Sequence, residues 1–211
     1  FCLFVNDGSN DASLEILKSR MAKCDSFQVL DLVANAGHQN AILAGMLAVW
    51  DEVDCAITLD VDLQDDVSVV PKMLDAHASG AEVVYGKRKE RISDSWFKRN
   101  TARAFYRLMT LMGVKLVPDH ADFRLMSRRA ISCLCEFGER NLFLRALISN
   151  MGLPSEIVYY DRKERSHGES KYTLRKMISF AWQGITSFSI VPLSFITAIG
   201  AFIFIVDCVL M

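Results

Sequence analysis

Short apolar runs alternate with amphipathic stretches over residues 1–160 of the chain. Runs typical of strands cover Phe1–Val5, Phe27–Val33, Cys55–Asp60, Glu82–Tyr85 and Glu156–Tyr160. Helical spacing of the apolar residues predicts helices over Ala12–Cys24, His38–Trp50, Val69–Ser79, Ser95–Met112 and Asn141–Met151. Strands that alternate with helices predict an α/β fold with a mostly parallel sheet covered by helices. In such sheets a ligand binds beyond the carboxyl ends of the strands.

The end of the chain is far more apolar than the rest. Residues 190–211 carry one charged side chain, Asp207, and as a helix they would reach roughly 33 Å. That length predicts a transmembrane helix, with a buried core helix as the alternative. In the preceding residues 173–188, Trp182 and other apolar residues share one helical face while Arg175 and Lys176 lie on the other. This pattern favours an interfacial helix over an ordinary surface helix.

Length and composition narrow the class of protein. The 211 residues suit one α/β domain with an appended segment, and the net charge of −1 gives no indication of a nucleic-acid partner. The six cysteines form no CxxC pair, which is typical of buried thiols in a reducing compartment. The chain opens inside an apolar strand and stops inside the hydrophobic run, so we expect a preceding strand and further membrane segments to be missing.

Acidic residues follow two of the predicted strands. Asp60-Val61-Asp62 ends the strand that begins at Cys55, and Asp7-Gly8-Ser9 follows the first strand. Two carboxylates two residues apart project to the same side, and such hard oxygen ligands suit Mg²⁺ or Mn²⁺ bound together with substrate phosphates. An ordinary surface turn is the alternative for each cluster. Because both clusters follow carboxyl ends of strands, we interpret them as one site.

Several ordered segments resemble the family 2 glycosyltransferases with a GT-A fold. The segments are VNDGSND, NAGHQNAILAG, LDVDLQDD, VYGKRKER, ADFRLMSRR and RSHGESKY. Within that family the chain resembles the polyprenyl-phosphate sugar transferases, the group that holds dolichol-phosphate mannose synthase and the bactoprenol glucosyltransferases. The resemblance extends from Phe1 to the region of Leu193. It implies a GT-A catalytic domain over residues 1–172, followed by the interfacial and transmembrane helices.

The resemblance also implies a donor half of the site. The residues expected to bind the donor are Asp7, Gly8, Ser9, Asn35 and Arg88. The residues expected at the metal ion, Mg²⁺ or Mn²⁺, are Asp60, Asp62 and Gln64, of which Asp62 also counts as catalytic. Asp7 would contact the nucleotide base and Arg88 the donor phosphates. One departure matters, because Ala34 stands where many relatives have an arginine, so a donor contact through that side chain is absent here.

The remaining implied roles concern catalysis and the acceptor. Asp122 and Arg124 match the DFRL motif, whose aspartate is usually proposed as the catalytic base; a purely structural Asp122–Arg124 pair is the alternative. A monophosphate acceptor has a second pKa near ~6 and is already anionic at neutral pH, so Asp122 is expected to orient it more than to remove a proton. Arg165, Ser170 and Lys171 match the R-x-x-G-E-S-K loop, which would clamp phosphate groups. The histidines are expected to have structural or solvent-facing roles.

These roles together predict a metal-dependent inverting glycosyltransferase that moves a hexose from a nucleotide sugar to a polyprenyl phosphate. UDP-glucose is favoured over GDP-mannose as the donor. We expect the protein at the cell membrane with its catalytic domain on the cytoplasmic side, and homo-oligomer formation stays open. One alternative is a family 2 transferase acting on a glycolipid or polysaccharide, although the chain lacks a Q-x-x-R-W segment. Another is a non-catalytic membrane binding module, which the intact Asp60, Asp122 and Lys171 disfavour.

Overall fold

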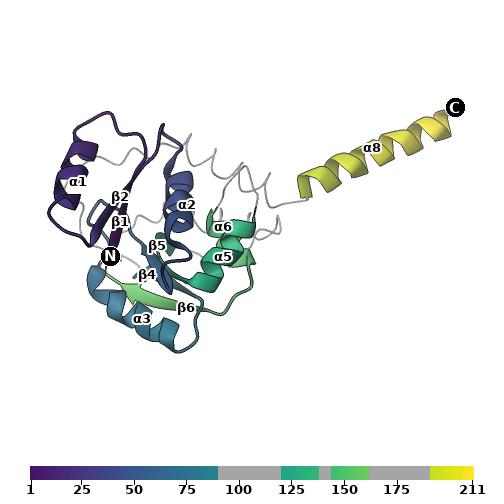
Figure 1. The fold of residues 1–211 in the computed structure, drawn as a ribbon. Helices are drawn as coiled ribbons and strands as arrows, with labels where there is room; N and C mark the ends of the chain where they lie inside the picture. Colours follow the sequence, from purple (N-terminus) through teal and green to yellow (C-terminus); the bar gives the residue numbers. More distant parts are fainter. Residues whose placement is uncertain (90–119, 138–143, 162–190) are drawn as a thin grey trace.

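A computed structural model describes residues 1–89, 120–137, 144–161 and 191–211 (Figure 1). The chain begins with a parallel pair of strands, β1 (Cys2–Asn6) and β2 (Phe27–Asp31), joined through helix α1 (Ser13–Met21). Helix α2 (His38–Val49) follows and contacts β1. Gly45 allows the close approach, because a Cβ there would lie 2.8 Å from a methyl carbon of Val5.

A second sheet holds four strands in the order β3-β5-β4-β6. The strands are β3 (Cys55–Thr58), β4 (Val83–Arg88), β5 (His120–Ser127) and β6 (Ser155–Tyr160). The other elements of this region are the 3-10 turn η1 (Val67–Val69) and the helices α3 (Val70–Ala78), α5 (Arg128–Glu136) and α6 (Leu144–Asn150). In Figure 1, α3 lies on one side of this sheet and α5 and α6 on the other.

The periodicity of the sequence predicted most of these elements. All five expected strands are confirmed, as are the helices expected over Ala12–Cys24, His38–Trp50, Val69–Ser79 and Asn141–Met151. The helix expected over Ser95–Met112 and the interfacial helix expected over 173–188 lie outside the described residues. The domain boundary at residue 172 stays a prediction for the same reason.

Strand β5 corrects the expectation of a mostly parallel sheet. No strand was predicted over residues 120–127, yet β5 occupies the middle of the sheet and runs antiparallel to both β3 and β4. Its charged residues, Asp122 and Arg124, alternate with Phe123 and Leu125, a pattern that is typical of a strand with two different faces. Because β5 runs opposite to its neighbours, its amino end lies beside the carboxyl ends of β3 and β4. This reversal brings Asp122 to the edge of the sheet where ligands bind.

The two faces of the sheet carry separate hydrophobic clusters. On one face Met126 packs with residues of α2, α5 and α6, including Met46, Ile131 and Leu147. On the other face Phe123, Leu125 and Tyr160 pack with residues of α3, including Met73. Each large side chain buried in this way contributes about 1.5–3 kcal/mol to stability. The charged residues at the amino end of β5 are therefore fixed by a strand with packing on both sides.

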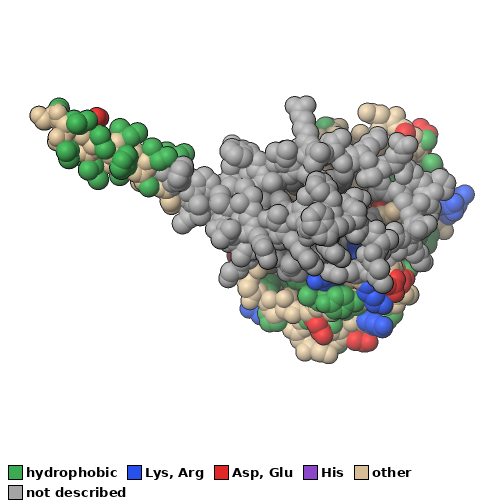
Figure 2. All heavy atoms as spheres, turned by 180° about the vertical axis from the view of Figure 1, so that it is seen from behind, with side chains coloured by type: hydrophobic (Ala, Val, Ile, Leu, Met, Phe, Trp, Pro, Cys, Tyr) green, Lys and Arg blue, Asp and Glu red, His purple; other side chains and the backbone are tan. Residues whose placement is uncertain are grey.

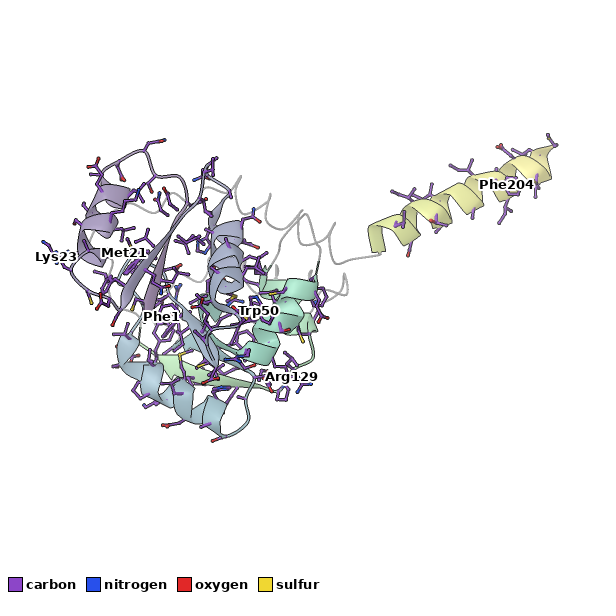
Figure 3. All side chains as sticks on the ribbon, in the orientation of Figure 1. Phe1, Met21, Lys23, Trp50, Arg129 and Phe204 are labelled. Carbon is purple, nitrogen blue, oxygen red and sulfur yellow. The ribbon has the colours of Figure 1, made fainter. Side chains whose placement is uncertain are left out.

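Helix α8 (Val191–Leu210) lies apart from the α/β domain in Figure 1. Hydrophobic side chains cover much of its described surface (Figure 2), and Phe204, 69% exposed, points away from the helix axis (Figure 3). Within the part of the chain that the structure describes, no helix has the length and apolar character that crossing a membrane requires. The expected transmembrane helix over residues 190–211 is therefore not supported.

Candidate active site

The turn after β1 binds the loop that leads into α2. The Asp7 carboxylate accepts hydrogen bonds from the backbone N–H groups of Ala36 (2.6 Å) and Gly37 (3.1 Å), and the Asn35 side chain donates to the Asp7 carbonyl (3.0 Å). Gly8 has a φ of 64°, and a Cβ there would lie 2.6 Å from the Asn35 backbone nitrogen. The positive φ and the close approach of the Asn35 backbone thus both require glycine at position 8. The structure brings together three of the residues expected to bind the donor, Asp7, Gly8 and Asn35.

Ser9 belongs to the same turn. Its backbone N–H donates to Asn6 Oδ1 (3.4 Å), and the buried Asn6 side chain donates to Asp31 Oδ1 (2.7 Å). Asn6 and Asp31 are the last residues of β1 and β2, so these bonds fix the carboxyl ends of the two parallel strands. The Ser9 side chain is exposed at this edge.

The loop after β3 places Asp60 and Asp62 around a strained turn. The Asp62 carboxylate accepts a hydrogen bond from the Gln64 backbone N–H (3.1 Å). Leu63 between them has a φ of 57°, a left-handed conformation that costs energy for a residue with a β-carbon. Strain of this kind is typical of sites where the backbone is held for a function.

Gln64 provides the observation that bears on a metal ion. Its side chain is buried, and Oε1 has no hydrogen-bond partner among the described residues. A buried oxygen left unmatched costs about 1–3 kcal/mol, and ligation of a cation would remove that cost. The described residues contain no group of three His, Cys, Asp or Glu side chains that could hold a metal ion. By chemical type, the carboxylates of Asp60 and Asp62 and the Gln64 amide oxygen are ligands that suit a hard divalent cation.

Asp60 and Asp62 are both partly buried, and the surroundings of Asp60 shift its pKa. Burial raises its pKa, and the neighbouring carboxylates of Asp122, Asp65 and Asp62 add to that rise, whereas His38 opposes it. The His38 Nε2 atom lies 3.9 Å from Asp60 Oδ1. The side chains around Asp60 thus compensate its negative charge poorly.

Asp122 is surrounded by two arginine side chains and one histidine. Arg124 donates a hydrogen bond from Nη2 to Asp122 Oδ1. Arg145 binds both carboxylate oxygens, through Nε to Oδ1 (3.3 Å) and through Nη2 to Oδ2 (3.1 Å). His38 Nε2 lies 3.1 Å from the same Oδ2. The side chains come from β5, α6 and the first position of α2, so three separate elements meet at this carboxylate.

These contacts decide the charge of Asp122. Burial by itself would raise its pKa, but the hydrogen bond from His38 and the charge and hydrogen bonds of Arg145 and Arg124 outweigh burial and hold the pKa far below its usual range. The hydrogen bond to Asp122 in turn raises the pKa of His38 against the opposing effect of burial. Asp122 therefore remains a carboxylate at any physiological pH and has little tendency to accept a proton.

Arg124 is fully buried, and its Nε and Nη1 groups have no hydrogen-bond partner among the described residues. Burial lowers its pKa, and the Asp122 charge opposes that shift. The Asp122–Arg124 pairing that the sequence left as a structural alternative is thus present. Asp122 also has contacts with a second arginine, Arg145, and with His38.

Arg88, expected near the donor phosphates, lies at the end of β4 in a hydrogen-bonded chain. Its Nε donates to the Tyr160 hydroxyl (3.2 Å), and that hydroxyl donates a hydrogen bond to Asp65 Oδ1. Arg88 Nη2 lies 3.6 Å from the same Asp65 oxygen. The chain connects the carboxyl ends of β4 and β6 to the loop that carries Asp60 and Asp62.

Three of the residues expected to bind phosphate groups lie outside the described residues: Arg165, Ser170 and Lys171. Four residues that the sequence reading did not select take part in the contacts of this region: His38, Asp65, Arg145 and Tyr160. His38 and Asp65 lie inside quoted motifs and could have been chosen on that ground. Nothing local marks Arg145 or Tyr160, since each reaches its partner only through the tertiary fold.

A model of "Glycosyl transferase family 2" matches residues 2–135, more than half of the chain. The α/β fold with acidic residues at the carboxyl ends of its strands is therefore that of a glycosyltransferase of the GT-A-like class. The chain belongs to glycosyltransferase family 2.

Relatives with similar sequences support the same assignment. The chain is 45% identical over 98% of its length to the "Uncharacterized glycosyltransferase YkoT" of Bacillus subtilis (strain 168), of which it covers 61%. It is 38% identical over 95% of its length to the bactoprenol glucosyl transferase of Shigella phage SfX, covering 66% of that protein. With the prophage bactoprenol glucosyl transferase homolog of Escherichia coli (strain K12) it shares 38% over 94% of its length and covers 64%. The chain thus spans less than two thirds of the length of these relatives.

Solved structures show more distant likeness. TarS 1–349 of S. aureus gives a TM-score of 0.46 at 16% identity, over 75% of this chain and 50% of that one. Glucosyl-3-phosphoglycerate synthase of Mycobacterium tuberculosis, in complex with Mn²⁺, UDP-glucose and phosphoglyceric acid, gives 0.49 at 14% identity, over 87% of this chain and 65% of that one. Likeness at this level indicates no donor, metal or acceptor for the present chain.

Proposed function

We propose that the protein transfers a hexose, with UDP-glucose as the favoured donor, to a polyprenyl phosphate at the cytoplasmic face of the cell membrane, with inversion at the anomeric carbon. The names of the relatives from phage SfX and Escherichia coli support the glucosyl donor and the bactoprenol-type acceptor. The observation that carries the proposal is the position of His38, whose Nε2 lies 3.1 Å from Asp122 and 3.9 Å from Asp60. This position supports a single site that includes the acid of the DFRL motif and Asp60, one of the acids expected at the metal.

Asp60, Asp62 and Gln64 would hold the divalent cation. Bound there, Mg²⁺ or Mn²⁺ supplies positive charge against the negative charge that develops on the departing nucleoside diphosphate. The partly buried Asp60 has a raised pKa and no close partner of its own other than His38 among the described residues, so the site is prepared for an added cation. Arg88 would bind the donor phosphates through guanidinium hydrogen bonds.

Asp122 positions groups rather than removing a proton. Its depressed pKa and its bonds to His38, Arg124 and Arg145 make it a weak base. A phosphate monoester needs no base, because its second pKa lies near ~6 and it is a dianion for much of the physiological pH range. In a single in-line displacement the phosphate oxygen forms a bond to the anomeric carbon while the bond from that carbon to the nucleoside diphosphate breaks. This gives the inverted product and the free nucleoside diphosphate. Asp122 keeps His38 and Arg145 in place during this step.

Transfer in membranes tests the proposal directly. Membranes containing the protein are incubated with polyprenyl phosphate and labelled UDP-glucose or GDP-mannose, with Mn²⁺, with Mg²⁺ or with a chelator. We expect label from UDP-glucose in the lipid fraction, and loss of that signal with chelator. Label found only in a glycolipid or polysaccharide would overturn the acceptor, and transfer that persists in chelator would overturn the metal role. Membranes carrying an Asp60→Asn/Asp62→Asn variant are the control for transfer by other enzymes.

A further inference from the structure

The chain of contacts from Arg88 through Tyr160 to Asp65 joins three parts of the sheet edge. Arg88 and Tyr160 are register partners at the ends of the parallel strands β4 and β6. Asp65 reaches them from the loop after β3, and its side chain is almost wholly buried. Tyr160 is 1% exposed and its ring packs edge-on against Phe123, with ring centroids 5.4 Å apart. The side chains of Asp65 and Tyr160 are therefore held in fixed positions.

The direction of the hydrogen bonds follows from the chemistry of the groups. An arginine can only donate, so Arg88 Nε gives its proton to the Tyr160 oxygen. A carboxylate can only accept, so the tyrosine hydroxyl donates to Asp65. Burial, and then the hydrogen bond to Asp65, raise the pKa of Tyr160 to about 12, so the hydroxyl keeps its proton. The buried Asp65 carboxylate thus attracts the Arg88 guanidinium group through the neutral Tyr160 hydroxyl.

Arg88 contacts both Tyr160 and Asp65, and the contact with Tyr160 is the shorter. The Nη2–Oδ1 separation between Arg88 and Asp65 is 3.6 Å, which is an ion pair but too long for a hydrogen bond. Among the described residues, only the Tyr160 hydroxyl is within hydrogen-bond distance of the Arg88 guanidinium group, at 3.2 Å. These contacts use Nε and Nη2, and within the described residues Nη1 makes no hydrogen bond. The Arg88 side chain remains 31% exposed, so one edge is held and the other is available to a ligand.

We propose that Tyr160 and Asp65 are positioning residues that hold the Arg88 guanidinium in place for the diphosphate of the nucleotide sugar. This inference rests on the proposed function, because it requires a diphosphate ligand at Arg88. An arginine that is held in advance loses less rotamer freedom when it binds phosphate. Tyr160 therefore affects donor binding without touching the donor.

The test compares Tyr160→Phe with the matched control Tyr159→Phe, which removes a hydroxyl from the adjacent residue of the same strand. Tyr159 is 54% exposed, and its ring lies under Lys87 rather than in the Arg88 chain. Tyr160→Phe keeps the ring that packs on Phe123. We expect it to raise KM for the nucleotide sugar roughly tenfold, the equivalent of one hydrogen bond to a charged group, with KM for the lipid phosphate changed less than about twofold. Tyr159→Phe should change neither constant by more than about twofold.

A double-mutant cycle separates positioning from a general structural role. In an Arg88→Ala background the added Tyr160→Phe substitution should change kcat/KM for the nucleotide sugar by less than about twofold, because its effect passes through Arg88. Equal effects in both backgrounds would overturn the inference, as would a Tyr160→Phe enzyme with the wild-type KM. Asp65→Asn, which keeps an acceptor oxygen but loses the charge, gives a second readout in case Tyr160→Phe folds poorly. It should raise the same KM by a smaller factor.

Failure of the proposed function gives a different result from failure of this inference. A wild-type protein that transfers no sugar in membranes overturns the proposed function. Binding of UDP alone, measured by calorimetry on wild type, Arg88→Ala and Tyr160→Phe, still tests the inference in that case. Weaker UDP binding by both variants but not by Tyr159→Phe supports positioning, and unchanged binding by Tyr160→Phe overturns it.

Discussion

Asp122 and Asp60 occupy the same edge of the sheet and share His38 as a neighbour, yet their surroundings move their pKa values in opposite directions. Asp122 is buried among His38, Arg124 and Arg145, which lower its pKa despite burial. Asp60 has only His38, at 3.9 Å, within ion-pair distance among the described residues, and burial raises its pKa. Cationic and hydrogen-bonding side chains compensate the charge of Asp122, whereas among the described residues only His38 lies near the charge of Asp60. The fold thus gives two identical side chains different electrostatic surroundings.

Replacing Asp122 should have the largest effect. Asp122→Asn leaves Arg124 buried without a counter-charge, a change that costs about 3–5 kcal/mol when a buried pair is broken. We expect transfer to fall more than about 100-fold, and by the same factor at each pH from about 6 to 9, because the carboxylate does not titrate in that range. Rate measurements across pH and denaturant unfolding check both effects. A loss that becomes smaller at high pH would instead identify Asp122 as a proton acceptor.

Asp60→Asn should separate activity from stability. We expect transfer to fall at least about tenfold and the rise in Tm on adding Mn²⁺ to disappear. The metal-free protein should be no less stable than wild type, because burial disfavours the charged form of Asp60. Thermal unfolding with chelator and with Mn²⁺ measures this, with Asp51→Asn on the exposed turn after α2 as the control. A large loss of stability in chelator would show that the protein itself compensates Asp60, which would remove the contrast with Asp122.

Arg145 offers a graded test of the Asp122 environment. Arg145→Lys keeps the charge but cannot bind both carboxylate oxygens, and Arg145→Gln loses the charge as well. We expect kcat to fall roughly fivefold for lysine and roughly twentyfold for glutamine. Steady-state kinetics of the two variants checks the order. Equal losses would mean that charge is irrelevant at this position and only the paired geometry matters.

The smallest effect concerns pH and His38. The folded-state pKa of His38 is raised above 6.5, first by the hydrogen bond to Asp122, so its stabilising contribution is complete below that pH and is lost as the pH rises through the folded value. We expect the free energy of unfolding of the metal-free wild type to decrease over that window, and less so for His38→Gln. The His38 side chain is 57% exposed, so solvent screening keeps the difference small. Urea unfolding at several pH values in chelator measures it, and parallel curves would contradict the proposed link.

Local periodicity was enough to predict most of the fold. The exceptions are β5 and α5. Strand β5 contains the DFRL segment, where charged and apolar residues alternate; its motif was recognised but its strand geometry was not. The helix α5, over Arg128–Glu136, was not predicted either. The acids at Asp7 and Asp60 were found because strand ends can be located from sequence. The partners of Asp122 could not be found in this way, since His38 lies 84 positions and Arg145 lies 23 positions away along the chain. Tyr160 looked like the end of an apolar strand, and only the register with Arg88 gives it a polar role.

Strand β5 also limits how this protein can change over evolutionary time. Asp122 and Arg124 belong to the site, whereas Phe123 and Leu125 between them belong to the core packed on α3. Because successive residues of a strand face opposite sides, deleting a single residue here would send the charges into the core and the apolar groups into the site. Such a length change would remove activity and folding together. Exchanging the side chains of Asp122 or Arg124 keeps this alternation, whereas a change of chain length within β5 does not.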